Sequence, residues 1–248
     1  MTSRTEKIVV IVPTYNESEN IASVIHAIFS ALKSILYADC HVLVYDSHSP
    51  DHTAEKVKAL QSEYPNLHLV IEPKKSGLGS AYIQAMDYAM HHLQADIVFE
   101  YDADGSHQPQ YLPPMIECLH QGCDVVIGSR YVPGGSIPQE WGLHRKLLSV
   151  LGNIIARIFL TSRYKDFTSG FRGTRVSYLK KIALHDLLSK QYAYKIHLLW
   201  ALHKAGANIQ EYPIQFIDRT KGHSKFPRNN ILDSLRVVLT LWWRKHHH

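Results

Sequence analysis

The chain contains little cysteine, and it has neither a zinc-type histidine pattern nor a long apolar run. Its three cysteines, Cys40, Cys118 and Cys123, have no metal-like spacing, and each lies in or beside an apolar stretch. We therefore expect buried free thiols in a reducing compartment instead of a disulfide framework. The 17 histidines are scattered, and no pair has the spacing of zinc ligands within a suitable motif.

A membrane-spanning segment is also missing, because no apolar run approaches the ~18 residues that would cross a bilayer. Residues 1–7 are polar and provide no apolar signal core. We therefore expect a cytoplasmic protein. With 45% hydrophobic and 20% charged residues, its composition is that of a globular enzyme.

A basic stripe of the kind that binds nucleic acid is absent. The formal net charge is +5, but the basic residues lie in separate motifs along the chain. We therefore expect no nucleic-acid partner. A modest basic excess suits other anionic partners, such as phosphorylated substrates or anionic lipid.

The first half of the chain alternates short β-rich runs with amphipathic helical patterns. Strands are predicted at 7–12, 41–45, 67–71, 96–101 and 124–128, and helices at 21–32, 53–63 and 79–93. This alternation predicts an α/β fold built from βαβ units around a mainly parallel sheet. Ligands of such sheets bind at the carboxyl ends of the strands.

The second half is less regular. A loop is predicted at 133–138, an amphipathic helix at 145–160, a strand at 208–217 and a last helix at 230–245. Pro213 should confine the strand to a sheet edge or a bulge. No repeat, low-complexity tract or linker interrupts the chain, so we expect a single domain over residues 1–245. The histidines at 246–248 have the composition of a purification-tag remnant.

Two carboxylates, Asp102 and Asp104, follow the fourth predicted strand. Carboxylates spaced this closely repel each other unless a cation lies between them. Their hard oxygen atoms suit Mg²⁺ or Mn²⁺, which would neutralise charge on a leaving diphosphate. The alternative is a polar turn without a metal, and these two residues alone leave both interpretations open.

The loops after the first three strands are also polar or glycine-rich. Tyr15 offers a ring to lie against a base, and Glu17 offers a carboxylate to accept its hydrogen bonds. The segment 77–79, Gly-Leu-Gly, lets the backbone approach a phosphate at a helix N-terminus. The alternative for the loop with Tyr15 and Glu17 is a capped turn between a strand and a helix. The alternative for the segment 77–79 is a loop that only starts a helix. All four loops should gather on one rim of the sheet.

Seven motifs, taken in order, resemble those of the inverting family-two glycosyltransferases. Within that family, they are most similar to the polyprenol (dolichyl) phosphate mannose synthases. They are Val12–Glu17, Ser49–Asp51, Gly77–Gly79, Asp102–His107, Gly128–Tyr131, Thr168–Arg172 and Arg219–Lys225. The resemblance covers nearly the whole chain. It implies a GT-A-type nucleotide-sugar-binding fold, with a donor half at about 1–130 and an acceptor and membrane-facing half at about 131–245.

The resemblance also implies site residues for the donor. The nucleotide-sugar would be held by Pro13, Tyr15, Glu17, Asp46, Lys75, Gly79 and Asp102. A Mg²⁺ or Mn²⁺ ion would be bound by Asp102 and Asp104, with Asp104 as the closer ligand. Ser106 is the third candidate ligand, although the family often has a glutamine there. Ser47 replaces a second aspartate found in many members, and His48 and His52 stand where small residues are common.

On the acceptor side, the resemblance places a polyprenyl phosphate against Arg130, Arg145, Ser149, Arg219 and Lys225. Arginine suits this role because its planar guanidinium binds phosphate bidentately. The lipid phosphate is already anionic, so its oxygen needs cationic positioning more than a general base. Asp104 and Arg130 are the predicted catalytic residues.

The predicted reaction is an inverting transfer of mannose from GDP-mannose to a polyprenyl phosphate. A UDP-sugar such as UDP-glucose is the alternative donor. Ser47 and Ser106 also leave open a different class of protein, one that binds nucleotide-sugar or lipid phosphate without catalysing a reaction. The helices at 145–160 and 230–245 combine apolar with basic residues, which favours peripheral membrane contact. The alternative interpretation is that both helices belong to the hydrophobic core. Many family members carry added transmembrane helices, so docking through a membrane-anchor partner protein is also predicted.

Overall fold

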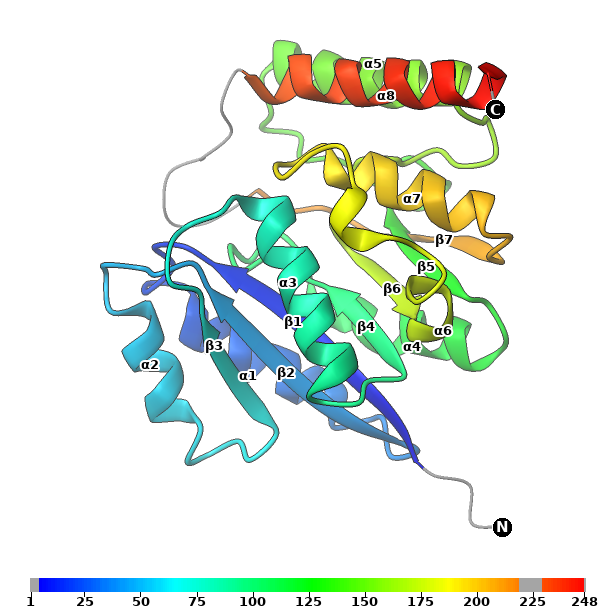
Figure 1. Ribbon diagram of the computed structural model, residues 1–248. Helices are drawn as coiled ribbons and strands as arrows, with labels where there is room; N and C mark the ends of the chain where they lie inside the picture. Colours follow the sequence, from blue (N-terminus) through cyan, green and yellow to red (C-terminus); the bar gives the residue numbers. More distant parts are fainter. Residues whose placement is uncertain (1–4, 219–228, 248) are drawn as a thin grey trace.

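A computed structural model of the protein describes residues 5–218 and 229–247, which form one seven-stranded sheet with helices around it (Figure 1). The strand order is β3-β2-β1-β4-β6-β5-β7. The strands are β1 Glu6–Thr14, β2 Ala38–Asp46, β3 Leu67–Ile71, β4 Ile97–Glu100, β5 Val125–Ser129, β6 Arg172–Arg175 and β7 Ile209–Pro213. Strands from both halves of the chain therefore share one sheet.

The predicted α/β class with a mainly parallel sheet is confirmed. Parallel pairs join β1 to β2 and β4, β2 to β3, and β5 to β7, whereas β6 runs antiparallel to β4 and β5. The sequence did not predict β6, because Arg172–Arg175 contains no apolar residue and so no alternation. The strand containing Pro213 lies at the sheet edge, as predicted, and ends there instead of at residue 217.

The helices include the five predicted ones and others that the sequence did not reveal. They are α1 Ile21–Leu32, α2 Thr53–Leu60, α3 Leu78–His91, α4 Leu112–His120, α5 Leu143–Phe159, α6 Val176–Leu179, α7 Tyr194–Lys204 and α8 Asn229–His247, with 3-10 turns η1 Pro109–Tyr111 and η2 Leu184–Asp186. The prediction missed α7 because its buried residues are spread around the helix and include Lys195, which leaves no separate polar face and so no clear helical period.

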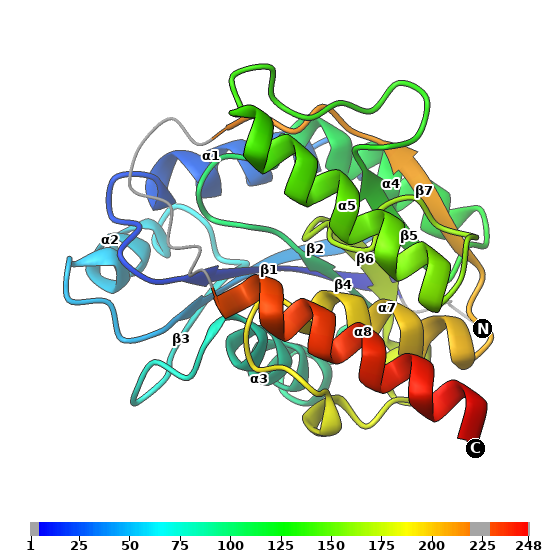
Figure 2. The same ribbon diagram turned by 90° about the horizontal axis from the view of Figure 1, so that it is seen from above.

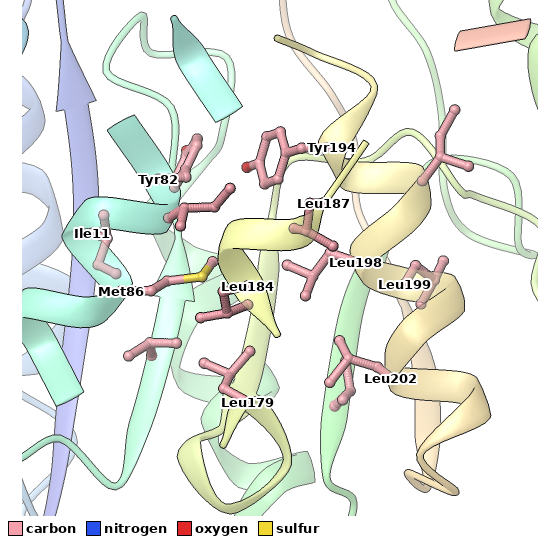
Figure 3. Packing of buried hydrophobic residues seen from close by; sticks show 14 of the residues in the cluster. Ile11, Tyr82, Met86, Leu179, Leu184, Leu187, Tyr194, Leu198, Leu199 and Leu202 are labelled. Carbon is pink, nitrogen blue, oxygen red and sulfur yellow. The ribbon is translucent and has the colours of Figure 1, made fainter. Parts of the chain in front are cut away.

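Side chains alternate between the two faces of the sheet and build two cores. On one face, Val10 of β1 and its alternate neighbours pack against α1, α2 and α4. On the other face, Val9 and Ile11 pack against α3 and α7. Figure 3 shows this second core, in which the rings of Tyr82 on α3 and Tyr194 on α7 stack with centroids 5.5 Å apart.

Helices α5 and α8 lie together as a separate layer beyond the sheet (Figures 1 and 2). They meet through Phe159 and Trp242, whose ring centroids are 5.7 Å apart. Only Asn153 and Ala156 of α5 are buried, so most of this helix is not core. Within the described ranges, no helix combines the length and hydropathy needed to cross a bilayer.

The expectation of buried thiols is correct only in part. All three cysteines are free, and Cys123 is buried, but Cys40 and Cys118 are half-buried. Burial raises the pKa of Cys40 to about 11 and that of Cys123 to about 12. These two thiols therefore stay protonated near neutral pH.

Candidate active site

A cavity of about 1330 Å³ opens at the carboxyl ends of the strands, where the four polar loops meet. Its wall includes these predicted residues: Pro13, Tyr15, Glu17, Lys75, Asp102, Asp104, Ser106, Arg130, Arg145 and Ser149. Asp46 and Gly79 do not line it, and Arg219 and Lys225 lie outside the described residues. The loops share one rim because parallel strands end on the same side of a sheet.

Asp46, predicted to bind the nucleoside, is buried beneath the first two loops. Its carboxylate accepts hydrogen bonds from the Thr14 hydroxyl (2.8 Å) and from the backbone N–H and hydroxyl of Ser49 (2.8 and 2.6 Å). Ser47, the neighbouring position where the family often has an aspartate, lines the cavity instead. In this chain Asp46 therefore joins the two loops, and its predicted contact with the nucleoside stays a prediction.

Three residues in these loops have left-handed backbone conformations. The φ angles are 56° at Asn16, 57° at His48 and 65° at His52. This region costs an L-residue with a Cβ roughly 1–2 kcal/mol, although Asn tolerates it better. The conformation explains why small residues suit positions 48 and 52. Strain held in the loops that line a cavity is typical of a functional site.

The third loop is held against the start of α7. Gly77 has a φ of 109°, and a Cβ there would lie 2.5 Å from the Gln191 side chain. Gly79 donates its N–H to the Lys190 carbonyl at 3.0 Å, so it packs against protein and not against the cavity. The Lys75 ammonium lies 3.4 Å from the centroid of the Tyr15 ring, which places a cation over the predicted base platform.

The carboxylates of Asp102 and Asp104 both line the cavity. Asp104 accepts the Ser106 N–H at 3.0 Å, which tightens the turn. The Ser106 hydroxyl is buried and has no hydrogen-bond partner among the described residues. An unpartnered buried hydroxyl next to two carboxylates fits a bound hard cation or phosphate oxygen. The described residues contain no cluster of three or more His, Cys, Asp or Glu ligands, so a cation here would also need oxygens from substrate or water.

Asp102 has three protein partners that the sequence did not reveal. The Tyr82 hydroxyl donates to it at 2.8 Å, and His107 Nε2 and Lys195 Nζ each lie 3.6 Å from its Oδ2. Burial alone would raise the pKa of Asp102, but Lys195, His107 and the Tyr82 hydroxyl together lower it. Asp102 is therefore ionised and already surrounded by donors.

Arg130 lines the cavity and is held by a buried carboxylate. Its Nε and Nη2 donate to Asp166 at 2.8 and 2.7 Å, and Nη2 also donates to the Thr168 hydroxyl at 2.7 Å. Burial would lower the pKa of Arg130, but Asp166 outweighs it and raises the pKa. Nη1 makes no hydrogen bond within the described part of the chain, so this donor can bind substrate.

Arg145 and Ser149 approach the same region from α5. The Arg145 guanidinium carbon lies 3.9 Å from the centroid of the Trp141 ring, and Nη1 donates to Asp218 at 3.0 Å. The Ser149 hydroxyl lies 2.7 Å from the Tyr131 hydroxyl. These contacts orient cationic and hydroxyl groups toward one volume. The cavity wall therefore combines paired carboxylates with arginine and serine side chains.

Apolar side chains of α5 and α8 close the cavity above these polar groups. The contributors are Leu148, Leu151 and Ile155 from α5 and Ile231, Leu235 and Val238 from α8. The opposite face of the same helices exposes further large apolar residues, among them Leu143, Leu147, Ile158, Leu232 and Trp243. One helix pair therefore joins an apolar cavity wall to an apolar outer surface.

Comparisons with known proteins match most of the chain to the family that its sequence motifs resemble. The model of glycosyl transferase family 2 matches residues 9–183. The chain is 36% identical over 235 residues to a polyprenol monophosphomannose synthase of Mycolicibacterium smegmatis, covering 94% of this chain and 86% of the relative. It is 35% identical over 236 residues to an undecaprenyl-phosphate mannosyltransferase of Micrococcus luteus, covering 95% and 93%.

A solved structure shows the same fold at lower identity. It is the glucosyl-3-phosphoglycerate synthase of Mycobacterium tuberculosis in complex with Mn²⁺, UDP and glucosyl-3-phosphoglycerate. The TM-score is 0.65 at 21% identity, covering 96% of this chain and 80% of that one. This similarity confirms the predicted GT-A-type fold.

Proposed function

This chain belongs to glycosyl transferase family 2, and we propose that it transfers mannose from GDP-mannose to a polyprenyl phosphate with inversion at the anomeric carbon. The observation that carries the proposal is a single cavity lined by the paired carboxylates, two arginines and apolar side chains of α5 and α8. The names of the two relatives support the mannosyl group and the lipid phosphate. The UDP in the related solved structure makes a UDP-sugar the second donor to test.

The donor end would hold the nucleotide-sugar through the four loops. Tyr15 and Glu17 line the cavity and would contact the base. Lys75, whose ammonium lies over the Tyr15 ring, would contact the same ligand. Asp102, Asp104 and the unpartnered Ser106 hydroxyl are the residues that would hold Mg²⁺ or Mn²⁺. Such an ion supplies charge neutralisation at the leaving diphosphate. The protein side chains fix the diphosphate so that the anomeric carbon faces the acceptor end.

The acceptor end would hold the lipid phosphate through Arg130 Nη1, Arg145 and Ser149. Asp166 and Trp141 keep the two guanidinium groups in place before substrate arrives. The arginine side chains therefore lose little conformational entropy when the phosphate binds. One phosphate oxygen would then attack the anomeric carbon opposite its bond to the diphosphate. That carbon–oxygen bond breaks, and the nucleoside diphosphate leaves with the electron pair. The attacking oxygen is already ionised, and no proton transfer to the protein is required.

The proposal is tested by incubating the protein with a short polyprenyl phosphate and radiolabelled GDP-mannose or UDP-glucose, with and without Mn²⁺. Metal-dependent label in the lipid fraction from GDP-mannose is the expected result. Label in the lipid fraction from UDP-glucose alone would show that the donor is a UDP-sugar and not GDP-mannose. Absence of label from both donors, with nucleotide binding retained, would instead support the silent binding protein.

Arg145→Ala is expected to raise the KM for the polyprenyl phosphate by about ten- to a hundredfold, since a charge-assisted hydrogen bond contributes about 1.5–3 kcal/mol. The affinity for GDP should stay within about twofold of the wild-type value, because the residue lies at the acceptor end. Steady-state kinetics and GDP titration measure the two quantities. Arg163→Ala, an exposed arginine outside the cavity wall, is the control. An equal loss of donor and acceptor binding would contradict the phosphate role.

The outer face of α5 and α8 supports contact with the membrane that holds the acceptor. Leu147 is 63% exposed and Trp243 is 53% exposed, and Lys146, Arg236 and Arg244 lie on the same two helices. An exposed apolar face bordered by basic residues binds an anionic bilayer through both apolar burial and charge. The inner face of the same helices lines the cavity, so this surface would place the lipid next to the site.

Leu147→Glu is expected to weaken binding to phosphatidylcholine–phosphatidylglycerol vesicles by about tenfold or more, because burying a leucine contributes about 1.5–3 kcal/mol. Sedimentation with the vesicles measures the bound fraction. Leu36→Glu is the matched control, since Leu36 is 90% exposed but lies between α1 and β2, away from α5 and α8. Similar vesicle binding by both variants would rule out this face as the membrane contact.

A further inference from the structure

Lys195, in the first turn of α7, is a buried cation at the donor end of the cavity. Its side chain is 1% exposed, and its ammonium lies 3.6 Å from Asp102 Oδ2. It also lies 4.8 Å from the centroid of the Tyr192 ring. A lysine is rarely buried to this degree, because removing an ammonium from water is costly unless an opposite charge compensates. Asp102 is that charge.

The surroundings of Lys195 are built to keep the ammonium in this place. Gly170 provides the room, since a Cβ there would lie 2.0 Å from Nζ and 3.0 Å from Asp102 Oδ2. Arg172 Nη2 donates to the Lys195 carbonyl at 3.3 Å, and Arg172 Nε lies 3.0 Å from Glu100 Oε2 in an ion pair. These contacts fix the start of α7 relative to β4 and β6, so the position of Lys195 is determined by the fold.

A cation held against Asp102 changes what the carboxylate pair can bind. A divalent cation and the ammonium compete for the same carboxylate, and their like charges repel within the cavity. Before a nucleotide arrives, the negative charge of Asp102 is balanced by Lys195. A diphosphate would add new negative charge and oxygen ligands on the open side of the cavity. Divalent binding should therefore be weak without the nucleotide and strong with it.

We propose that Lys195 is a positioning residue, an internal counter-cation of Asp102 that makes divalent-cation binding depend on the diphosphate of the donor. This inference rests on the proposed function only for the presence of a diphosphate ligand. It does not depend on which sugar is transferred or on the acceptor. It predicts that the metal enters the site together with the nucleotide.

The test is a titration of the full-length protein with Mn²⁺, in which free Mn²⁺ is followed by electron paramagnetic resonance, with and without GDP or UDP. Lys195→Gln removes the charge and keeps a polar side chain. We expect this variant to bind Mn²⁺ at least about tenfold more tightly than the wild type without nucleotide. The gain in affinity on adding nucleotide should shrink by a similar factor. A structural defect alone would weaken metal binding and would not tighten it.

Two further variants make the result decisive. Lys204→Gln, an exposed lysine at the other end of α7, makes the same charge change and should leave Mn²⁺ binding unchanged. Gly170→Ala should push the ammonium away from Asp102 and also tighten nucleotide-free binding, so the proposal remains testable if Lys195→Gln does not fold.

The outcomes separate the two proposals. Wild-type protein that binds Mn²⁺ in neither condition would contradict the metal requirement in the proposed function and this inference with it. The role of Lys195 alone would be overturned by a different pair of results. In that case nucleotide strengthens Mn²⁺ binding by the wild type, but the folded variants at positions 195 and 170 bind Mn²⁺ no more tightly than the wild type does.

Discussion

Alanine in place of Asp104 is expected to lower kcat for mannosyl transfer by about a thousandfold. Stabilising charge on the leaving diphosphate is worth several kcal/mol, and each ~1.4 kcal/mol changes the rate tenfold. The fold should survive, because Asp104 lies in the cavity wall and the substitution removes its hydrogen bond with the Ser106 N–H. That loss, about 1 kcal/mol, lowers Tm by about 2–4 °C in a chain of this size.

Transfer kinetics over a range of Mn²⁺ concentrations and a thermal melt measure both parts of the Asp104 prediction. Asp186→Ala is the matched control, because Asp186 is an exposed aspartate outside the cavity wall. Turnover near the wild-type value in Asp104→Ala would remove this carboxylate from the metal-binding proposal. If excess Mn²⁺ restored turnover, Asp104 would contribute to metal affinity and not to the chemical step.

Asparagine in place of Asp166 is expected to lower the free energy of unfolding by about 3–5 kcal/mol, which is the usual cost of leaving one buried charge without its partner. Asp166 is fully buried, and it accepts hydrogen bonds from the Arg130 backbone and guanidinium. The guanidinium cannot lose its proton to escape the cost. Urea denaturation measures the change.

The matched control for Asp166 is Asp218→Asn, which breaks the ion pair with Arg145. Both partners of that pair are more than a third exposed, so solvent screening should limit the change to below about 1 kcal/mol. Equal effects of the two substitutions on the unfolding free energy would show that burial of the Arg130–Asp166 pair is not what matters. Folded Asp166→Asn protein should also show a raised KM for the polyprenyl phosphate, because Arg130 loses its orientation.

Local patterns in the sequence were enough to predict the donor-binding part of the molecule. Each strand from β1 to β5 is a short apolar run, and a polar or glycine-rich loop follows each of the first four. Since parallel strands end at one edge, the pattern also predicted that Tyr15, Lys75 and Asp104 share a cavity. Here chain order and spatial order are linked by a simple rule of sheet topology.

The same reasoning missed every element that lacks a local period. The antiparallel strand β6 has a polar sequence and is stabilised by its pairing with β4 and β5 and by the buried Arg172–Glu100 pair. Helix α7 buries most of its residues, Lys195 among them, so its polar and apolar side chains do not separate into two faces. Neither element can be recognised until its neighbours are known, since its surroundings select its conformation.

The sequence by itself determined the α/β class and the carboxylates at the end of β4, because these follow from residue type and short spacing. The arginines predicted to bind phosphate were implied by the resemblance to the family. Only the tertiary structure decided which charges meet. It pairs Arg130 with Asp166, joins Asp46 to Thr14 and brings Lys195 of α7 to Asp102. These contacts join segments far apart in the chain, and burial, which sets their strength, is a property of the whole fold.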